Sequence, residues 1–552
     1  MEQSQESKLK SVLKKFMSHD ILLSPDAVKE LNSLSDEQLS LLLSKIESLP
    51  AAVLTSDIKK IVESSPNAAD VNWIEFEHHR VNAEKNSDTE VYNRFLNILA
   101  SEPEPSDNAP SSESGASKQH SSPSFKPGSE KPSPAGSVEV VFSYDKTVAK
   151  REVRDFSLYY NKRYQSLQHL LSSRQELQNV TSIARVLAKK DRENLSIIGI
   201  VSDISLSRNG NLMLTLEDPT GEIKVVVSKS KPELFKAARD IVLDEVIGVA
   251  GANGNRVVFA TNIIWPDIPA MTEQKRSPDE AFAIFLSDIH VGSNNFLPDE
   301  FNRFLDWISG NAGSPSQREI ASKVRYVFIA GDIVDGVGVY PGQESELVIP
   351  DIEKQYESAA ELLSRIPSHI PLIICPGNHD AGRIAEPQLK LGTGFSKALS
   401  NLPNAVFVSN PAVVRIHSSP SFPGFNVLMY HGYSFDYFIA NVDSIRTQGG
   451  YDRADLMMRF LLQRRHLAPT QGSTLYIPDP DMDPLVIQHV PDFFVSGHIH
   501  KCSVSNYKGT TLISGSCWQS TTDFQRKVGH HPEPARVPIV NLQTREVKIL
   551  RF

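Results

Sequence analysis

The chain of 552 residues contains few cysteines and no long apolar run. Its three cysteines, Cys375, Cys502 and Cys517, are an odd number in a long chain, which favours a reducing compartment over a disulfide framework. No stretch approaches the roughly 18 consecutive apolar residues of a membrane span, and the polar start MEQSQESKLK lacks the apolar core of a secretory signal. We therefore expect a soluble, cytoplasmic protein that makes no membrane contact.

The sequence also lacks an excess of positive charge. A formal net charge of −9 excludes a protein that coats nucleic acid through bulk positive charge, so any contact with nucleic acid must be local or shared with a partner. With 22% charged and 40% hydrophobic residues, the composition is typical of a globular protein. The length suffices for about two to four domains, each with its own core.

The first part of the chain predicts a helical module followed by a linker. Within residues 1–100, Ser24 and Pro25 form a helix start, and Ser35 with Gln38 forms a capping box. We expect a packing or docking module there, because no residue pattern in it indicates chemistry. Residues 101–137 are rich in Ser, Pro and Gly and have too few apolar side chains to offset the entropy of ordering, which predicts a disordered linker.

Residues 138–190 and 191–272 predict a helical connection and a small barrel. The connection carries apolar residues at helical spacing, namely Phe156, Tyr160, Tyr164, Leu167 and Leu171. The barrel segment reads as five short strands with Asn209-Gly210 as a hairpin turn and one helical insertion, which indicates an OB-type barrel. It is poor in basic and aromatic residues, which favours a structural or protein-docking barrel over a nucleic-acid-binding one.

Five short polar motifs each follow a short apolar run within residues 273–552. In chain order the motifs are SDIH (Ser287–His290), GDIVD (Gly331–Asp335), GNHD (Gly377–Asp380), YHG (Tyr430–Gly432) and GHIH (Gly497–His500). The preceding runs, such as AFAIFL and PLIIC, predict buried strands. In an open α/β sheet, ligands bind at the carboxyl ends of strands, where loops from separate strands meet. We therefore expect the five loops to face one site.

The loops carry the mixture of carboxylates, imidazoles and one amide that suits a pair of divalent ions. We expect the ligands to divide as follows: Asp288 and His290 on one ion, Asp332 as the bridge, Asn378 and His431 on the other ion, and His498 and His500 shared between them. Two ions about 4 Å apart activate water and clamp the attacking and leaving oxygens of a displacement at phosphorus. This donor set suits Mn, Fe or Zn better than Ca or Mg, and we expect two Mn ions.

His379 and Asp380 are expected to act in catalysis and not as ligands. A histidine at position 379 can stabilise the transition state or protonate the departing oxyanion, and Asp380 could fix the orientation of its ring. For Asp335 the sequence leaves open whether it joins the site or only hydrogen-bonds a neighbouring loop. The histidines outside the motifs receive no role in the site: His417, His466, His489, His530 and His531.

The order of the five motifs resembles that of the calcineurin-like metallophosphoesterases, whose fold is a two-sheet α/β sandwich with the metals at the strand ends. An OB-type barrel before such a domain is similar to the small, B-type subunits of replicative DNA polymerases. The stretches Tyr340–Gln388 and Gly497–Gln519 resemble the small subunits of archaeal family D DNA polymerase. The resemblance covers roughly residues 150–552. It implies an α+β multidomain protein in which residues 273–552 form the phosphoesterase domain.

The resemblance further implies a 3′-5′ proofreading exonuclease that pairs with a large polymerising subunit and removes single-stranded or mismatched 3′ ends of DNA. It leaves contact with a sliding clamp open. The site is also similar to that of the nuclease in the double-strand-break repair complex. That similarity implies the following division: Asp288, His290, Asp332 and His500 on one ion, and Asp332, Asn378, His431 and His498 on the other.

Two other functions remain open at this point. The eukaryotic B-subunits share the architecture but have lost ligands and act as scaffolds, so a non-catalytic scaffold for the large subunit is the first alternative. Every expected ligand is present in this chain, which favours an active nuclease. A phosphodiesterase for small phosphoesters is the second alternative, and the barrel before the phosphoesterase domain argues against it.

Overall fold

The structure is a computed structural model that describes residues 22–23, 53–54, 137–146, 149–189, 191–269, 273–522, 525–526 and 530–552. The chain divides into two compact units, Met1–Lys126 and Pro127–Phe552. In the first unit, two short parallel strands are described, β1 (Leu22–Leu23) and β2 (Val53–Leu54). The helical module predicted for residues 1–100 and the linker predicted for residues 101–137 otherwise lie outside the described residues, except for Ser137.

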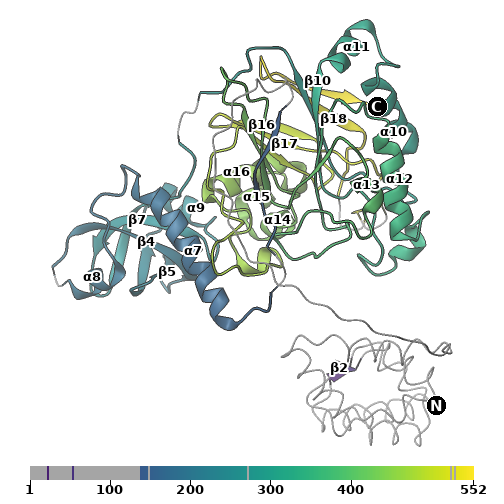
Figure 1. The fold of residues 1–552 in the computed structure, drawn as a ribbon. Helices are drawn as coiled ribbons and strands as arrows, with labels where there is room; N and C mark the ends of the chain where they lie inside the picture. The colour runs from purple at the N-terminus through teal and green to yellow at the C-terminus, as the bar shows by residue number, and fades with distance from the viewer. Residues whose placement is uncertain are drawn as a thin grey trace, which may run out of the picture. The chain divides into compact units, whose positions relative to one another are not determined.

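The second unit contains a closed five-stranded barrel (Figure 1). Its strands are β4 (Asn194–Leu206), β5 (Leu212–Asp218), β6 (Gly221–Val227), β7 (Val246–Asn253) and β8 (Val257–Ile264). They close in the order β4-β5-β6-β8-β7, and helix α9 (Pro232–Ala238) follows β6. These are the strands and the helical insertion that the sequence predicted. Gly210 adopts a φ of 77° in the first hairpin, which a residue without a Cβ atom adopts at no steric cost.

Helix α7 (Val153–Ser172) packs against the barrel, and the short helix α8 (Ile183–Ala188) follows it. The prediction of a helix in this region is confirmed, and Tyr164, Leu167 and Leu171 lie in a shared core with barrel residues. Phe156, at the start of the predicted apolar face, is exposed instead. The prediction that the whole of residues 138–190 is helical is wrong, because Val138–Ser143 forms strand β3.

Two six-stranded sheets form the part of the second unit that the sequence predicted to be a phosphoesterase domain, called the phosphoesterase part below. The first has the order β12 (Ala405–Phe407), β11 (Leu372–Cys375), β10 (Val324–Ala330), β9 (Phe282–Leu286), β18 (Arg536–Asn541) and β19 (Val547–Arg551). The second has the order β16 (Ser503–Tyr507), β17 (Thr510–Ser514), β15 (Phe493–Ser496), β14 (Phe425–Met429), β13 (Ala412–Ile416) and β3. Strand β3 therefore belongs to this sheet, as the antiparallel neighbour of β13.

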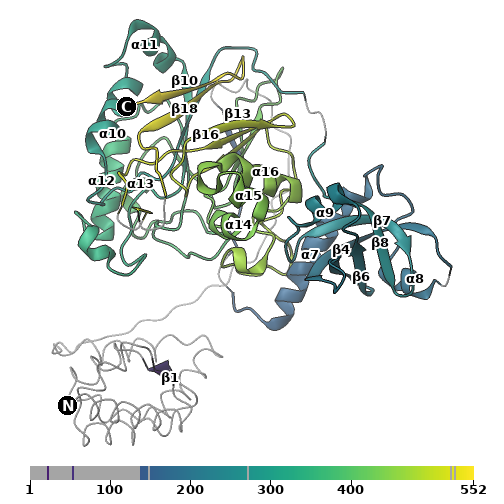
Figure 2. The same cartoon turned by 180° about the vertical axis from the view of Figure 1, so that it is seen from behind.

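The sheets pack face to face with helices on both outer sides (Figures 1 and 2). Strand β9 shows why its sequence is apolar throughout: Phe285 faces the other sheet, whereas Ile284 faces the helices, so neither face meets water. The outer helices of the first sheet are α10 (Pro298–Ile308), α11 (Pro315–Ser322), α12 (Ile352–Ser364) and α13 (Lys397–Ser400). Those of the second are α14 (Phe435–Asn441), α15 (Asp443–Thr447) and α16 (Ala454–Arg464), and short 3-10 turns are η2 (Gln343–Glu346), η3 (Gly450–Asp452) and η4 (Gln471–Ser473).

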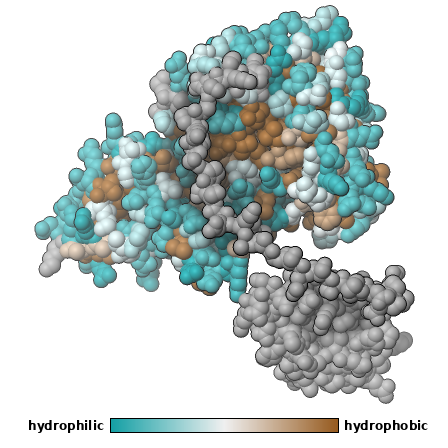
Figure 3. Space-filling model, in the orientation of Figure 1, coloured by the Kyte–Doolittle hydropathy of each residue, from teal (hydrophilic) through white to brown (hydrophobic). Residues whose placement is uncertain are grey.

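Buried charged contacts join the barrel, α7 and the phosphoesterase part. The Arg163 side chain of α7 donates to the Asp483 carboxylate at 2.7 Å and to the carbonyls of Pro469 and Asp244 at 2.6 and 3.3 Å. Most of the surface visible in Figure 3 is hydrophilic, with one larger apolar area on the phosphoesterase part. Among the described residues, no helix is long and apolar enough to cross a membrane.

Candidate metal centre

The five predicted loops follow five observed strands. Strands β9, β10 and β11 run parallel in the first sheet, and β14 runs parallel to β15 in the second. The loops after their carboxyl ends carry all of the predicted ligands, as the parallel arrangement of an α/β sheet requires.

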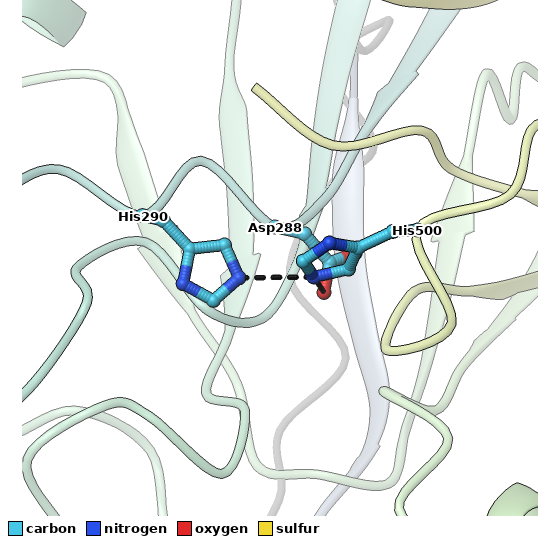
Figure 4. A group of neighbouring side chains, drawn as sticks. All are labelled: Asp288, His290 and His500. Atoms are coloured by element: carbon cyan, nitrogen blue, oxygen red, sulfur yellow. Dashed lines mark hydrogen bonds and ion pairs between the residues drawn. The ribbon is translucent and has the colours of Figure 1, made fainter. Parts of the chain in front are cut away.

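One group of side chains joins the β9 loop to the last of the five loops. Asp288, His290 and His500 offer ligand atoms that all lie within 4.8 Å of one another. The His290 and His500 rings point toward each other with their Nε2 atoms 3.1 Å apart, and His500 Nε2 lies 3.4 Å from Asp288 Oδ1 (Figure 4). Two ring nitrogens and a carboxylate oxygen that converge in this way suit a cation, because each presents a lone pair to the same space.

A second group lies around Asp332. Asp332, His431 and His498 also offer ligand atoms within 4.8 Å of one another. The Asn378 Oδ1 atom lies 2.9 Å from His431 Nε2 and 3.0 Å from His498 Nδ1. The amide oxygen of Asn378 therefore completes this group.

The Asp332 carboxylate lies between the two groups. Its Oδ2 atom is 3.2 Å from His431 Nε2 in the second group and 3.9 Å from His290 Nε2 in the first. Burial alone would raise the pKa of Asp332, but the neighbouring charges of His431 and His379 hold it well below its usual range. Asp332 is thus available as an ionised carboxylate that can bridge two ions.

The outer nitrogen of each ligand histidine has its own hydrogen-bond partner. The four contacts are His290 Nδ1 to Asp335 Oδ1 at 3.0 Å, His431 Nδ1 to the Ala330 carbonyl at 2.8 Å, His498 Nε2 to Asp436 Oδ2 at 2.9 Å, and His500 Nδ1 to Gln525 Nε2 at 2.9 Å. The acceptors beside His290, His431 and His498 fix the tautomer in which the other ring nitrogen can bind metal, whereas the Gln525 amide donates to His500 Nδ1 and fixes only the position of that ring. The donor set and these outer partners together fit a two-ion centre.

The backbone at the ligands is unusual. Five of the predicted ligands have a positive φ: Asp288 (49°), His290 (55°), Asp332 (52°), His498 (72°) and His500 (55°). Non-glycine residues rarely adopt this left-handed region, and those that do cluster at functional sites. The tight turns at the strand ends therefore aim these side chains at one point.

Glycines precede three of the ligands because no side chain fits there. A Cβ atom at Gly331 would lie 2.5 Å from His431 Nδ1, and one at Gly377 would lie 2.1 Å from Asp332 Oδ1. At Gly497 it would lie 2.5 Å from Asp288 Oδ2. The glycines of the GDIVD, GNHD and GHIH motifs thus leave room for ligands that come from other loops.

The chain is similar to known proteins over most of its length. A family model described as calcineurin-like phosphoesterase matches residues 283–502. The DNA polymerase II small subunit of Methanothermobacter thermautotrophicus is 42% identical over 401 residues, which cover 73% of this chain and 80% of that protein. The chain belongs to the archaeal DNA polymerase II small-subunit family. This family is the one that the sequence motifs resembled, namely the small subunits of archaeal family D DNA polymerase.

Other members of the small-subunit family match over the same share of the chain. The Pyrococcus furiosus small subunit is 39% identical over 72% of this chain, and the match spans 64% of that protein's length. The Halobacterium salinarum small subunit is 36% identical over 73% of this chain and 75% of its own. Among solved structures, the S. pombe Stn1-ten1 complex overlaps 14% of this chain at 23% identity with a TM-score of 0.13, which is too little to bear on fold or function.

Within this small subunit, His379 lies beside the first group of ligands. Its ring is 4.7 Å from that of His290 in an edge-on arrangement, and its Nδ1 lies 2.7 Å from the Asp335 carbonyl. Burial is the main cause that lowers the pKa of His379. The expectation that Asp380 orients the His379 ring is wrong: the Asp380 carboxylate accepts hydrogen bonds from the Gly377 and Ile333 amides and from the Tyr356 hydroxyl.

Sequence reasoning missed several residues around the centre of this small subunit. Asp436 and Gln525 hold ligand histidines, but neither lies in a motif. Asp335, left open by the sequence, holds His290. His530, to which the sequence gave no role, packs on Tyr451 with ring centroids 3.7 Å apart. Burial is the main cause that lowers the pKa of His530, and the charge of Asp436 opposes it.

Proposed function

We propose that this chain carries the metal-dependent 3′-5′ exonuclease of its polymerase and removes mismatched nucleotides from DNA ends. The observation that carries the proposal is the convergence of all seven expected ligands in two adjoining groups, with Asp332 between them. Membership in a small-subunit family implies a large catalytic subunit as partner. The 3′-5′ polarity is the part of the proposal that comes from the family resemblance alone.

The ligands divide between the ions by proximity. We assign Asp288, His290 and His500 to one ion, and Asn378, His431 and His498 to the other, with Asp332 as the bridge. The mixture of imidazole and carboxylate favours Mn²⁺, with Fe and Zn as alternatives. When bound, the ions supply an activated water and neutralise charge on the phosphodiester.

The residues of the chain position the substrate and move a proton. The His379 Nδ1–H donates to the Asp335 carbonyl, which leaves Nε2 as the ring nitrogen that can take up a proton and, in the protonated ring, donate it to an oxygen of the phosphodiester. We assign to His379 the stabilisation of the transition state or the protonation of the departing oxyanion. Asp380 supports this chemistry indirectly, because its hydrogen bonds to Gly377 and Ile333 join the loops that carry Asn378 and Asp332.

A nuclease assay tests the proposal. The full chain with Mn²⁺ should degrade single-stranded and 3′-mismatched DNA from the 3′ end. His379→Ala should lower the rate by about a hundredfold or more, and Asp332→Ala should abolish it. The exposed His369, changed to Ala, is the matched control that should leave the rate unchanged.

The outcomes also separate the alternatives. Undiminished degradation of DNA by both site variants would refute the assignment of nuclease activity to this metal centre. If the wild type shows no nuclease while ligand variants still support DNA synthesis by the complex, the chain is a scaffold for the large subunit. Turnover of cyclic nucleotides without turnover of DNA would make it a phosphodiesterase for small phosphoesters.

A further inference from the structure

Two half-buried tyrosines border the metal centre, one beside each group of ligands. Tyr340 lies in the loop after β10, and the centre of its ring is 6.3 Å from that of His379. The His379 ring in turn lies 4.7 Å from the ring of His290 in the first group. Tyr433 lies in the loop after β14, and its ring is 5.7 Å from that of His498 in the second group. The sequence motifs gave neither tyrosine a role.

The backbone of each tyrosine loop packs closely on the loop of the neighbouring histidine. A Cβ atom at Gly336, in the first tyrosine loop, would lie 2.4 Å from the His379 carbonyl oxygen. A Cβ atom at Gly432, directly before the second tyrosine, would lie 3.4 Å from the Gly497 carbonyl oxygen. Both glycines have a positive φ, of 77° and 118° respectively. Close contact between the loops therefore holds both tyrosine rings beside the centre.

Neither tyrosine ring is covered by a stacked aromatic partner in the part of the chain that the structure describes. The planes of the Tyr340 and His379 rings meet at 63°. Those of Tyr433 and His498 meet at 58°, so neither histidine lies flat on a tyrosine face. Since both side chains are only half-buried, part of each tyrosine also meets solvent. Each ring is thus available to a flat ligand.

The polar surroundings of the two rings favour a nucleobase over a phosphate group. The Tyr340 hydroxyl donates to Glu346 Oε2 at 3.1 Å, so its hydroxyl is engaged and its ring is what it can offer to a ligand. Beside Tyr433, the His498 ring is held at Nε2 by Asp436 Oδ2 at 2.9 Å. A carboxylate near each tyrosine repels a phosphate oxygen, whereas an uncharged base meets no such penalty.

We propose that Tyr340 and Tyr433 stack on unpaired nucleobases of the two nucleotides that flank the phosphate at the metal centre. Stacking on an aromatic side chain holds single strands of any sequence, because every base has a π face. A base inside a duplex is already paired and stacked, so it costs less to present a base from a single-stranded or mismatched end. The two tyrosines thereby act as specificity residues for unpaired ends, an inference that rests on the proposed function for its phosphodiester substrate.

An oligonucleotide without terminal bases tests the stacking directly. The two substrates are 5′-fluorescein oligothymidylate and the same oligonucleotide with tetrahydrofuran abasic residues as its last two 3′ nucleotides. In Mn²⁺, the full wild-type chain should have a KM for oligothymidylate that is lower by about tenfold or more than its KM for the abasic substrate. Tyr340→Ala and Tyr433→Ala should each raise the KM for oligothymidylate about tenfold and leave the KM for the abasic substrate nearly unchanged.

The phenylalanine variants of both tyrosines keep the ring and should keep the wild-type KM values. Tyr507→Ala is the matched control, a half-buried tyrosine of β16 whose hydroxyl donates to Asp267 at 2.8 Å, and it should leave the preference for oligothymidylate unchanged. An unchanged KM for oligothymidylate in either alanine variant of the site would overturn the inference. A loss of equal size on both substrates, or in the phenylalanine variants as well, would also overturn it.

Binding in EDTA separates this inference from the proposed function, because it needs no catalysis. Fluorescence anisotropy measures the affinity of the full chain for the same two oligonucleotides. If the wild type has no nuclease activity but prefers oligothymidylate, and the alanine variants lose this preference, the stacking role stands and the proposed function fails. If the wild type degrades DNA and the alanine variants keep the preference, the proposed function stands and the stacking role fails.

Discussion

Each ligand histidine in this chain has two ring nitrogens, and only one of them can bind an ion. The other nitrogen needs a hydrogen-bond partner. His498 is held from outside by Asp436, a residue in the first turn of α14 that lies beyond the YHG motif. The Asp436 carboxylate accepts from Nε2 at 2.9 Å, which leaves Nδ1 directed at Asn378 Oδ1. Helix α14 thereby links the loop of His431 to the loop of His498.

Asp436→Asn should weaken metal binding in the second group. Loss of an outer carboxylate partner typically costs about 10-fold to 100-fold in metal affinity, because the ring loses both its orientation and part of its basicity. Isothermal titration of the full chain with Mn²⁺ would measure the change, and Asp436→Glu should recover part of it. Asp299→Asn, an exposed acid in the first turn of α10, is the control; equal affinity in the Asp436 and Asp299 variants would refute the role.

At the scale of elements, helix α12 supports two loops of the centre. The Tyr356 hydroxyl lies 3.2 Å from Asp380 Oδ1 and accepts from the Ala381 amide at 2.7 Å. Gln355 of the same helix bonds both the amide and the carbonyl of Gly336, just after Asp335. The helix begins at an N-cap, Asp351, whose carboxylate accepts from the Glu353 and Lys354 amides.

Asp351→Ala should lower the free energy of unfolding by about 1 kcal/mol, because two amides of the first turn lose their acceptor. Urea denaturation followed by circular dichroism would measure the loss. Asp351→Ser, which keeps a capping oxygen, should retain most of the stability. A loss of the same size in both variants would show that the cap hydrogen bonds are not the cause.

At the scale of the whole second unit, a buried network joins α7, the barrel and the phosphoesterase part. Asp483 accepts from Arg163 at 2.7 Å and from His466 Nε2 at 2.8 Å. The Ala468 amide donates to His466 Nδ1 at 3.0 Å, so the ring is held in its neutral form. The pKa of His466 is lowered to about 4, mainly by burial and secondly by the charge of Arg163.

This network should make the fold less stable in acid. In the unfolded chain His466 takes up a proton near its ordinary pKa of 6.5, whereas in the fold it stays neutral down to about 4. Its contribution is therefore complete above pH about 6.5 and is lost as the pH falls from there to about 4, by an amount on the order of 2 to 3 kcal/mol. Denaturation of the full chain at pH 7.5 and pH 5 should show the loss.

His466→Gln should reduce this dependence on pH, although the variant is less stable at every pH. The exposed His369, changed to Gln, serves as control and should keep the wild-type dependence. If His466→Gln and the wild type lose the same free energy between the two pH values, another group is responsible.

The sequence by itself determined the local units. Runs such as FAIFL and LIIC are apolar throughout because strands between two covered faces meet no water, so the positions of β9 and β11 and of the loops after them could be predicted. The barrel strands and α7 followed from their periodicity and turns in the same way. The predicted ligands could be named because each lies at the end of such a strand.

Only the tertiary structure decided which of these strands, helices and side chains contact one another. Strand β3 was missed because it pairs with β13, and contacts such as Tyr144 N–H to Ser409 Oγ join positions 265 residues apart. Asp436 and Gln525 carry no motif, since their roles depend on which side chains of other elements lie beside them. Hydrophobic periodicity predicts whether a residue is buried. The partner of a polar side chain depends on long-range packing, which the local sequence does not predict.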